Sequence, residues 1–217
     1  MSYKILDCTL RDGGYYTDWK FDTELVRQLV KSLDSNNVDI IELGYKSPII
    51  GGPYRKCNDG FINSIINFKV KADLAFMIDV KDYIVGGKVN ELLIKDIIKP
   101  STVFKICRVA SKYNEIHHIP EMVKILQDLG YKVICNLMAV SKILNKEIEE
   151  YINITKCLNL LSIYVADSYG ALYPKDVKQI FQNKSISGIH THDNMGLAFA
   201  NCLEALEGGA TYIDGTL

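Results

Sequence analysis

The chain has 217 residues, and its 25 Lys and Arg nearly balance its 26 Asp and Glu, which argues against a basic surface for nucleic acid. It contains no apolar run of about 18 residues that could cross a membrane, and its first residues enter an apolar strand pattern without the layout of a signal peptide. The six cysteines form no C-x-x-C pair and mostly lie in apolar runs, so we expect buried thiols in a reducing, cytoplasmic setting.

Apolar stretches of strand length alternate along the chain with amphipathic stretches of helix length. The predicted strands cover residues 4–8, 38–43, 72–80, 103–109, 131–138, 161–166, 186–191 and 211–217. The predicted helices cover residues 22–33, 61–68, 89–98, 119–129, 146–158, 175–181 and 197–206. Asp22 is the expected N-cap of the first helix, with Leu25 and Val26 on its buried face. The long loop at 44–60 is rich in Gly and Pro and is expected to be functional.

This alternation predicts the fold class. Continuous apolar strands separated by helices indicate a parallel sheet that is covered on both faces. Eight strands favour an α/β fold of the (β/α)₈ TIM-barrel type, as one domain over residues 1–217. A doubly wound open sheet is the alternative, and it is disfavoured because no G-x-G-x-x-G follows the first strand. No helix is predicted after the eighth strand, so we expect a barrel that lacks its final helix and is truncated at its C-terminus.

Two histidines at the end of the seventh predicted strand are the first candidates for chemistry. Side chains alternate along a strand, so His190 and His192 point to the same side. They form half of a metal site or, alternatively, a hydrogen-bonded pair at the rim. In a TIM barrel the first and seventh strands are separated only by the eighth, which brings Asp12 near both rings. One carboxylate and two imidazoles suit Mn²⁺, Mg²⁺, Zn²⁺ or Co²⁺.

Further polar residues follow the first two predicted strands at the same end of the barrel. Arg11 carries a cationic fork that fits a carboxylate or a developing enolate oxygen, or it forms a rim ion pair with Asp12. Glu42 supports the site or bonds to the backbone. Gly13 and Gly14 are expected to let substrate approach the backbone closely.

The remaining candidates each have a structural alternative. Asn136 faces substrate or forms hydrogen bonds with neighbouring groups inside the barrel. Asp167 and Ser168 contact substrate or cap the turn after the sixth strand. Tyr15 faces substrate or packs within the loop after the first strand. Arg108 faces either substrate or solvent, and solvent is the expected side.

Four segments resemble the signature segments of a known family. They are D-C-T-L-R-D-G-G (7–14), I-E-L-G (41–44), A-D-S-Y-G-A-L-Y-P (166–174) and H-T-H-D-N-M-G (190–196). In this order they resemble the HMG-CoA-lyase-like, or DRE-TIM, metallolyases, a family of TIM barrels that make or break a carbon–carbon bond beside a carbonyl. Within the family, the resemblance is to the catalytic domains of the 4-hydroxy-2-oxovalerate aldolases, and it runs from residue 7 to residue 217.

The resemblance implies roles for the residues that match the family's motifs. It implies Asp12, His190 and His192 as metal ligands, Arg11 as the arginine that steadies an enolate, and Glu42 as the acidic residue that supports the site. Asp167 matches the acidic residue of the strand-six motif. Taken with the reading of the strand ends, this makes Arg11, Asn136, Asp167 and Ser168 the candidate substrate contacts.

Two departures from the family pattern stand out. The oxovalerate aldolases carry a histidine, thought to be the base, three residues after the metal aspartate, and here that position is Tyr15. Tyr15 would serve as the proton-transfer group only with a perturbed pKa or through water. The family also continues past the eighth strand into a G-x-G-x-x-x-G-N loop and a helix that have no counterpart before residue 217.

The resemblance implies a metal-dependent aldolase that cleaves a 4-hydroxy-2-oxo acid, or a related substrate, through a metal-bound pyruvate enolate. The alternative enzyme is an acyl-CoA-dependent 2-oxo-acid synthase of the isopropylmalate or citramalate type. The third possibility is a truncated barrel that only binds a ligand or partner. For the aldolase we expect a small oxo-acid substrate, a homo-oligomer and an aldehyde dehydrogenase as a candidate partner, with neither nucleic acid nor a membrane.

Overall fold

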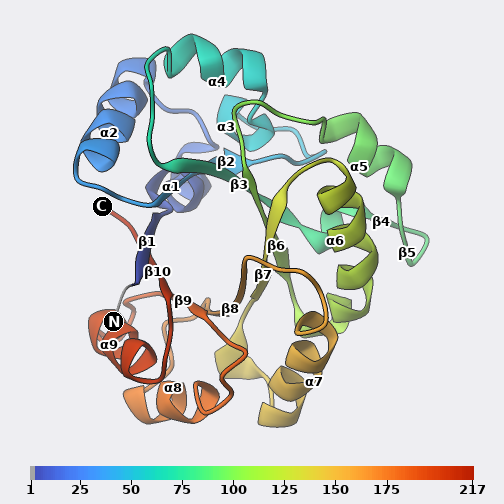
Figure 1. Ribbon diagram of the computed structural model, residues 1–217, viewed down its shortest axis with the longest axis vertical. Helices are drawn as coiled ribbons and strands as arrows, with labels where there is room; N and C mark the ends of the chain where they lie inside the picture. Colours follow the sequence, from blue (N-terminus) through green and yellow to red (C-terminus); the bar gives the residue numbers. More distant parts are fainter. Residues whose placement is uncertain (1–2) are drawn as a thin grey trace.

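Eight parallel strands form a closed barrel in the computed structural model, which describes residues 3–217 (Figure 1). The barrel strands are β1 (Lys4–Asp7), β2 (Ile40–Tyr45), β3 (Asp73–Asp79), β6 (Ile106–Ser111), β7 (Lys132–Leu137), β8 (Ser162–Asp167), β9 (Gly188–Thr191) and β10 (Tyr212–Gly215). Their order around the barrel is β1-β10-β9-β8-β7-β6-β3-β2, and β1 lies between β10 and β2. The predicted TIM barrel is therefore confirmed.

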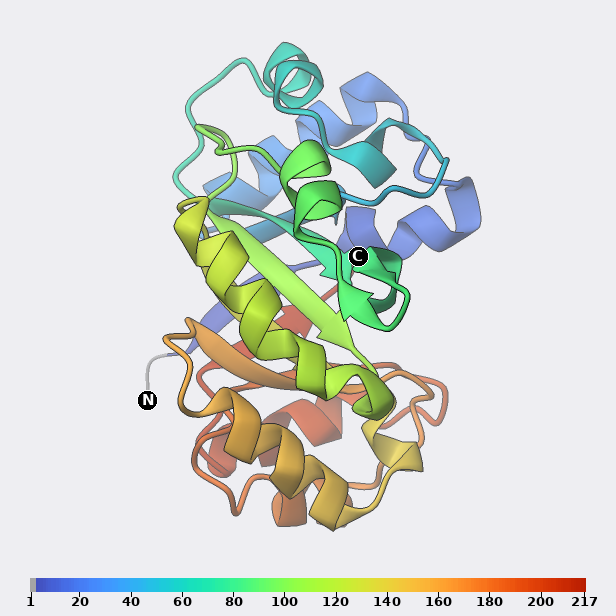
Figure 2. The same ribbon diagram turned by 90° about the vertical axis from the view of Figure 1, so that its right-hand side faces the viewer.

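Helices surround the strands and cover their outer faces (Figure 2). They are α1 (Thr9–Thr17), α2 (Thr23–Ser35), α3 (Pro53–Lys56), α4 (Asp59–Ile65), α5 (Glu91–Ile97), α6 (Ile119–Asp128), α7 (Asn145–Thr155), α8 (Pro174–Ile180) and α9 (Ala198–Glu207), with 3₁₀ turns η1 (Val80–Tyr83), η2 (Tyr113–His118) and η3 (Val140–Lys142). Within residues 3–217 no helix follows β10. Across the same residues, none of the helices is long and apolar enough to cross a membrane.

The α2 helix begins as predicted, because the side chain of Asp22 accepts a hydrogen bond from the backbone N–H of Leu25. Val26, Val30 and Leu33 are its buried residues. The prediction that Leu25 belongs to the buried face is wrong, since its side chain is 56% exposed. Adjacent residues on a helix are about 100° apart, so Leu25 falls outside the stripe that Val26 and Val30 define.

Two other predicted segments differ from the structure in detail. The region 44–60, predicted as a loop, contains α3 and the start of α4, because Asn58 caps the backbone N–H groups of Gly60 and Phe61. The helix predicted at 89–98 begins at Glu91. Before it, the chain forms a small antiparallel hairpin of β4 (Ile84–Val85) and β5 (Lys88–Val89), which projects from the side of the barrel (Figure 1).

The segment after β1 was expected to be a loop, and the structure corrects this. Residues Thr9–Thr17 form the α1 helix. A Cβ at Gly14 would lie 2.1 Å from Nε1 of Trp19, so this glycine makes room for the indole rather than for substrate. Trp19 in turn donates a hydrogen bond from Nε1 to the backbone oxygen of Arg11 at 3.1 Å. The tight packing therefore holds the start of α1, where Arg11 and Asp12 lie.

Inside the barrel, an apolar layer gives way to a charged one toward the C-terminal ends of the strands. Leu6, Ile40, Ile106, Ile134 and Tyr212 belong to a buried apolar cluster. Alternate strand residues face the same side. Two residues further along the strands of Ile40, Ile106 and Tyr212 come the buried side chains of Glu42, Arg108 and Asp214. The change from apolar to charged marks the end of the barrel that carries the candidate site.

Candidate metal centre and active site

Asp12, His190 and His192 converge at the C-terminal end of the barrel. Asp12 comes from the first turns of α1, and the two histidines from the end of β9, so β10 and β1 bring them together. Nε2 of His190 lies 3.1 Å from Nε2 of His192 and 3.4 Å from Oδ2 of Asp12. The structure thus places one atom from each of the three residues within 4.8 Å of the others.

These distances fit a divalent cation. Two ligand atoms that each lie about 2.0–2.2 Å from one cation are roughly 2.8–3.6 Å apart when the bond angle is about 90–110°. Both contacts of His190 Nε2 fall inside this range. Burial and the neighbouring His190 ring lower the pKa of His192, which favours the neutral imidazole that binds metal. Asp12, His190 and His192 are therefore the residues that could hold the ion.

Asp214, which the sequence analysis did not include among the site residues, backs His190. Its Oδ2 lies 2.9 Å from Nδ1 of His190 and 2.7 Å from Nη2 of Arg108. Burial alone would raise the pKa of Asp214, but Arg108 and His190 lower it below the ordinary value, so the carboxylate is charged. A carboxylate at Nδ1 leaves Nε2 of His190 free to face Asp12 and His192.

Arg11 and Arg108 share one carboxylate in the barrel interior. Oε2 of Glu42 accepts hydrogen bonds from Nε of Arg11 at 2.8 Å and from Nη1 of Arg108 at 2.9 Å. Arg11 also pairs through Nη1 with Asp12. Burial alone would lower the pKa of Arg11, but Glu42 and Asp12 raise it, so the guanidinium remains charged. Arg11 and Glu42 thus lie together at the C-terminal end of the barrel, and their pairing came only from the structure.

The prediction that Arg108 faces solvent is wrong, because its side chain is fully buried. The sequence did contain a signal. Arg108 lies within the run Ile106–Ala110, whose four other residues are all apolar, and the strand is predicted to be covered on both faces. A charge in such a place must be paired with an opposite charge. In the structure its ring-stacking neighbour is Tyr164, whose ring centroid lies 4.8 Å from the guanidinium carbon.

Tyr15 lies on α1 at the mouth of the barrel. Its hydroxyl is 2.8 Å from the hydroxyl of Tyr45, and its ring packs edge-on against Trp19 and Tyr45. Burial raises the pKa of Tyr45, which therefore stays protonated and can donate a hydrogen bond to Tyr15. Tyr15 itself is 64% exposed. Tyr15 thus packs against two aromatic rings, and it also lines the pocket over the site.

Two of the three remaining candidates, Asn136 and Asp167, keep a buried side-chain oxygen without a hydrogen-bond partner among the described residues. Asn136 is buried, and its Oδ1 has no hydrogen-bond partner among the described residues. Ser168 Oγ accepts from the backbone N–H of Ala139 at 3.0 Å, and Oδ2 of Asp167 accepts from that of Leu172 at 2.8 Å. Asp167 thus caps the turn after β8 through Oδ2 and leaves Oδ1 without a partner. Of the two free oxygens, only that of Asn136 belongs to a residue that lines the pocket over the site.

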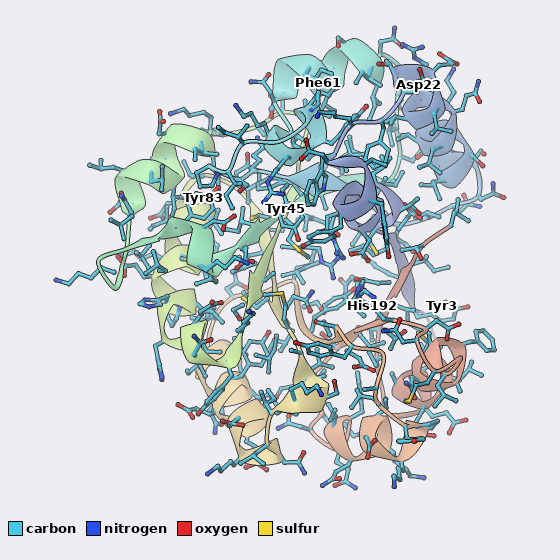
Figure 3. The ribbon with its side chains drawn as sticks, turned by 180° about the vertical axis from the view of Figure 1, so that it is seen from behind. Tyr3, Asp22, Tyr45, Phe61, Tyr83 and His192 are labelled. Atoms are coloured by element: carbon cyan, nitrogen blue, oxygen red, sulfur yellow. The ribbon has the colours of Figure 1, made fainter. Side chains whose placement is uncertain are left out.

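A pocket of about 700 Å³ lies over these residues. Arg11, Asp12, Tyr15, Asn136, Ser168, His190 and His192 line it, whereas Glu42 and Asp167 do not. Tyr45, at the end of β2, and His192, just after β9, face this pocket from either side of β1 and β10 (Figure 3). Tyr16, Phe21, Met77 and Met138 add apolar surface. The arrangement can hold a small anionic ligand between a cation site and the Arg11 guanidinium.

Comparison with protein families gives one family model, described as HMGL-like, that matches residues 2–217. Among curated proteins, the chain is 29% identical to 4-hydroxy-2-oxovalerate aldolase from Carboxydothermus hydrogenoformans, over 98% of this chain and 64% of the relative. It is 26% identical to the protein of the same name from Pelotomaculum thermopropionicum, over 99% and 64%. The chain therefore spans less than two thirds of the length of these relatives.

Solved structures agree with the fold. The N-terminal domain of a candidate aldolase from Bacteroides vulgatus superposes with a TM-score of 0.83 at 28% identity, over 99% of this chain and 72% of that one. HMG-CoA lyase from Bacillus subtilis superposes with a TM-score of 0.75 at 15% identity, over 99% and 76%. At this low identity, the similarity to HMG-CoA lyase supports the barrel fold alone.

Proposed function

The chain belongs to the HMGL-like family, and on this premise we propose that it is a divalent-metal-dependent carbon–carbon lyase of the aldolase type. The proposed substrate is a 4-hydroxy-2-oxo acid or a close relative, and the products are an aldehyde and a 2-oxo acid such as pyruvate. One observation carries the proposal: Asp12, His190 and His192 converge beside the charged Arg11 in one pocket. The names of the curated relatives support the same reaction class.

A divalent cation held by Asp12, His190 and His192 would supply a Lewis acid that polarises the 2-oxo group of the substrate. Arg11 adds a fixed positive charge beside it. Its Nε and Nη1 are engaged by Glu42 and Asp12, while Nη2 has no acceptor among the described residues. Nη2 is therefore the atom proposed to hold the oxygen on which negative charge develops as the carbon–carbon bond breaks.

Cleavage also requires that the 4-hydroxyl group lose its proton. Tyr15, in its phenolate form, is proposed as the group that receives it, directly or through water, since its oxygen lines the pocket in the place of the family's histidine. Tyr45 would hold the Tyr15 oxygen by donating a hydrogen bond to it, because burial keeps Tyr45 protonated. Asn136 offers a free acceptor atom, Oδ1, to a hydroxyl or water on the opposite side of the pocket.

The donor set favours some cations over others. Two imidazoles and one carboxylate combine the ligands of Zn²⁺ and Co²⁺ with those of Mn²⁺ and Mg²⁺, so these four ions are the proposed cofactors. The released aldehyde is electrophilic, and an aldehyde dehydrogenase partner that oxidises it remains part of the proposal. So does assembly of the chain into a homo-oligomer.

Deuterium exchange tests the proposed function with the chain as it stands. In D₂O with Mn²⁺ or Co²⁺, the protein should exchange the methyl protons of pyruvate or a related 2-oxo acid, measured by proton NMR, because enolate formation is common to both directions of the reaction. Arg11→Ala should slow the exchange by a factor of about 10²–10³ by removing the charge at the developing oxyanion.

Arg27→Ala is the matched control, because Arg27 lies on α2 and pairs with the exposed Glu24. It should exchange at the wild-type rate. If a panel of 2-oxo acids and acyl-CoA thioesters shows no exchange with the metal-loaded protein, the lyase is excluded and a barrel that only binds a ligand is the better description. Exchange of thioester protons alone would favour the acyl-CoA-dependent synthase.

A further inference from the structure

A continuous line of buried charged groups crosses the barrel from Arg11 to His190. It runs from Arg11 to Glu42, from Glu42 to Arg108, from Arg108 to Asp214 and from Asp214 to His190, with contacts of 2.8, 2.9, 2.7 and 2.9 Å. The two ends are the arginine and one proposed metal ligand of the site. Arg108 and Asp214 themselves do not line the pocket.

Stability does not explain why these charges are buried here. The side chains of Glu42 and Arg108 are fully buried, and that of Asp214 is 1% exposed. Taking such charges out of water costs several kcal/mol per ion, and apolar residues of similar volume often serve stability equally well. The neighbouring layer of the barrel interior is filled by apolar side chains in this way. Ile40 and Ile106 belong to it, two residues before Glu42 and Arg108 on the same strands.

The hydrogen bonds between these buried residues also argue against a role in stability alone. Each carboxylate uses a single oxygen for both of its hydrogen-bond partners: Oε2 of Glu42 for the two arginines, and Oδ2 of Asp214 for Arg108 and His190. Oε1 of Glu42, Oδ1 of Asp214 and Nε of Arg108 have no partner among the described residues. A network built for stability alone would satisfy these atoms, because buried polar groups without partners are costly.

We propose that Arg108 and Asp214 are positioning residues that fix His190 in the Nδ1–H tautomer and keep its Nε2 directed at the cation site, in register with Arg11. Asp214 accepts a hydrogen bond from the Nδ1–H group, so Nε2 carries a lone pair rather than a proton. Arg108 holds Asp214 in place by tying it to Glu42, which also holds Arg11. The cation ligand and the oxyanion-binding arginine are thereby linked through one buried side chain.

This inference rests on the proposed cation site, but its first test needs no cation. Ring ¹⁵N NMR shifts distinguish the two neutral tautomers of histidine, and the chain has four histidines, two of which belong to the site. In metal-free wild type at pH 8, His190 should show a protonated Nδ1 and a bare Nε2. In Asp214→Asn the carboxylate charge is absent, and a mixture of both tautomers should appear. A wild-type His190 protonated at Nε2 overturns the proposal.

The second test is the affinity for Mn²⁺, measured by titration calorimetry. Asp214→Asn should weaken it by a factor of about 10–100, the range found when a group that orients a ligand is removed. Arg108→Lys keeps the charge but not the planar fork that spans two carboxylates, so it should weaken Mn²⁺ binding in the same direction although Arg108 touches no proposed ligand. If Asp214→Asn does not fold, the Mn²⁺ affinity of Arg108→Lys tests the positioning role.

Asp59→Asn is the control, since Asp59 pairs with the buried Lys46 at 3.0 Å, outside this network. It should change thermal stability at most and leave the Mn²⁺ affinity unchanged. An affinity within about twofold of wild type in a folded Asp214→Asn or Arg108→Lys overturns the positioning role of that residue. A wild type that binds no cation would overturn the proposed function instead, while the tautomer of His190 would still be read in the metal-free protein.

Discussion

His190 shows how much of this site depends on the two faces of single side chains. Its Nδ1 meets Asp214 on the buried side, and its Nε2 meets Asp12 and His192 on the pocket side. Arg11 is divided similarly, with Nε toward Glu42 and Nη1 toward Asp12. Each residue thus has one contact on the buried side that orients it and one contact toward the pocket. Substitutions at the site should therefore separate effects on binding from effects on folding.

The first prediction concerns the cation. Wild-type protein should bind about one divalent ion per chain, and Asp12→Ala or His190→Ala should abolish stoichiometric binding, because each removes one of three donors. Elemental analysis after dialysis against Mn²⁺ measures this, and circular dichroism checks that the barrel has folded. His117→Ala, at a side chain that is 69% exposed, is the control. Equal metal content in all four proteins would falsify the site.

The second prediction separates the two neighbouring tyrosines of α1. Tyr15→Phe should slow cleavage of a 4-hydroxy-2-oxo acid by a factor of about 10² or more, since it removes the oxygen proposed to receive the proton. Tyr16→Phe should leave the rate near that of wild type, because it keeps the ring that adds apolar surface to the pocket and removes only an exposed hydroxyl without a partner among residues 3–217. Both variants should bind Mn²⁺ like wild type. Aldehyde release can be followed with a coupled dehydrogenase assay, and equal rates for the two variants would exclude Tyr15 as the proton acceptor.

At the scale of elements, α1 is the part that departs most from expectation. A helix with two adjacent glycines is weak by propensity, since each costs up to about 1 kcal/mol relative to alanine. Packing offsets this: Trp19 is buried against the helix and bonds to the backbone of Arg11, and Tyr15 and Tyr45 pack against the indole. Tertiary contacts therefore hold the helix that presents Arg11 and Asp12.

The third prediction uses these two glycines as a matched pair. Gly14→Ala should destabilise the protein by roughly 1–3 kcal/mol, because the new methyl group would overlap the buried indole of Trp19. Gly13→Ala should be neutral or stabilising by up to about 1 kcal/mol, since the nearest atom lies 3.9 Å from the added Cβ and alanine favours the helix. Urea unfolding gives both free energies. Similar values for the two variants would mean that Trp19 does not pack as described.

For the molecule as a whole, the order of strands around the barrel decides which residues meet. Because β1 pairs with β10 and β10 with β9, the start of α1 lies next to the end of β9, although Asp12 and His190 are far apart in the chain. The closed barrel leaves no free edge among its strands. By contrast, the β4–β5 hairpin pairs only two residues on each strand.

The fourth prediction follows from this contrast. Backbone amides of β6 and β7, which pair with each other at six positions, should exchange with D₂O most slowly, at a free energy near that of global unfolding. Amides of residues 84–89 should exchange orders of magnitude faster, because this hairpin has few ladder bonds and an exposed Val85. Hydrogen exchange followed by mass spectrometry resolves the two regions. Equal protection would show that the hairpin is a cooperative part of the barrel.

The sequence by itself determined the barrel and which polar residues stand at its C-terminal end. Strand and helix periods are local properties, so eight apolar strands and the helices between them could be read along the chain. The period of two on a strand also placed His190 and His192 on one face, and the strand order of a barrel brought Asp12 to them. The prediction of a loop after the first strand was wrong, because α1 has a low helix propensity and depends on tertiary packing against Trp19.

Only the tertiary structure decided how the charges of the site are paired. Glu42 and Arg108 are 66 residues apart, and Arg108 and Asp214 are 106 apart, so no local pattern relates them. A buried parallel strand is apolar on both faces, and its sequence therefore does not say which alternate residues point into the barrel. That choice of face put Arg108 inside rather than in solvent, because its charge could be compensated only by two carboxylates that barrel closure brings within hydrogen-bond distance.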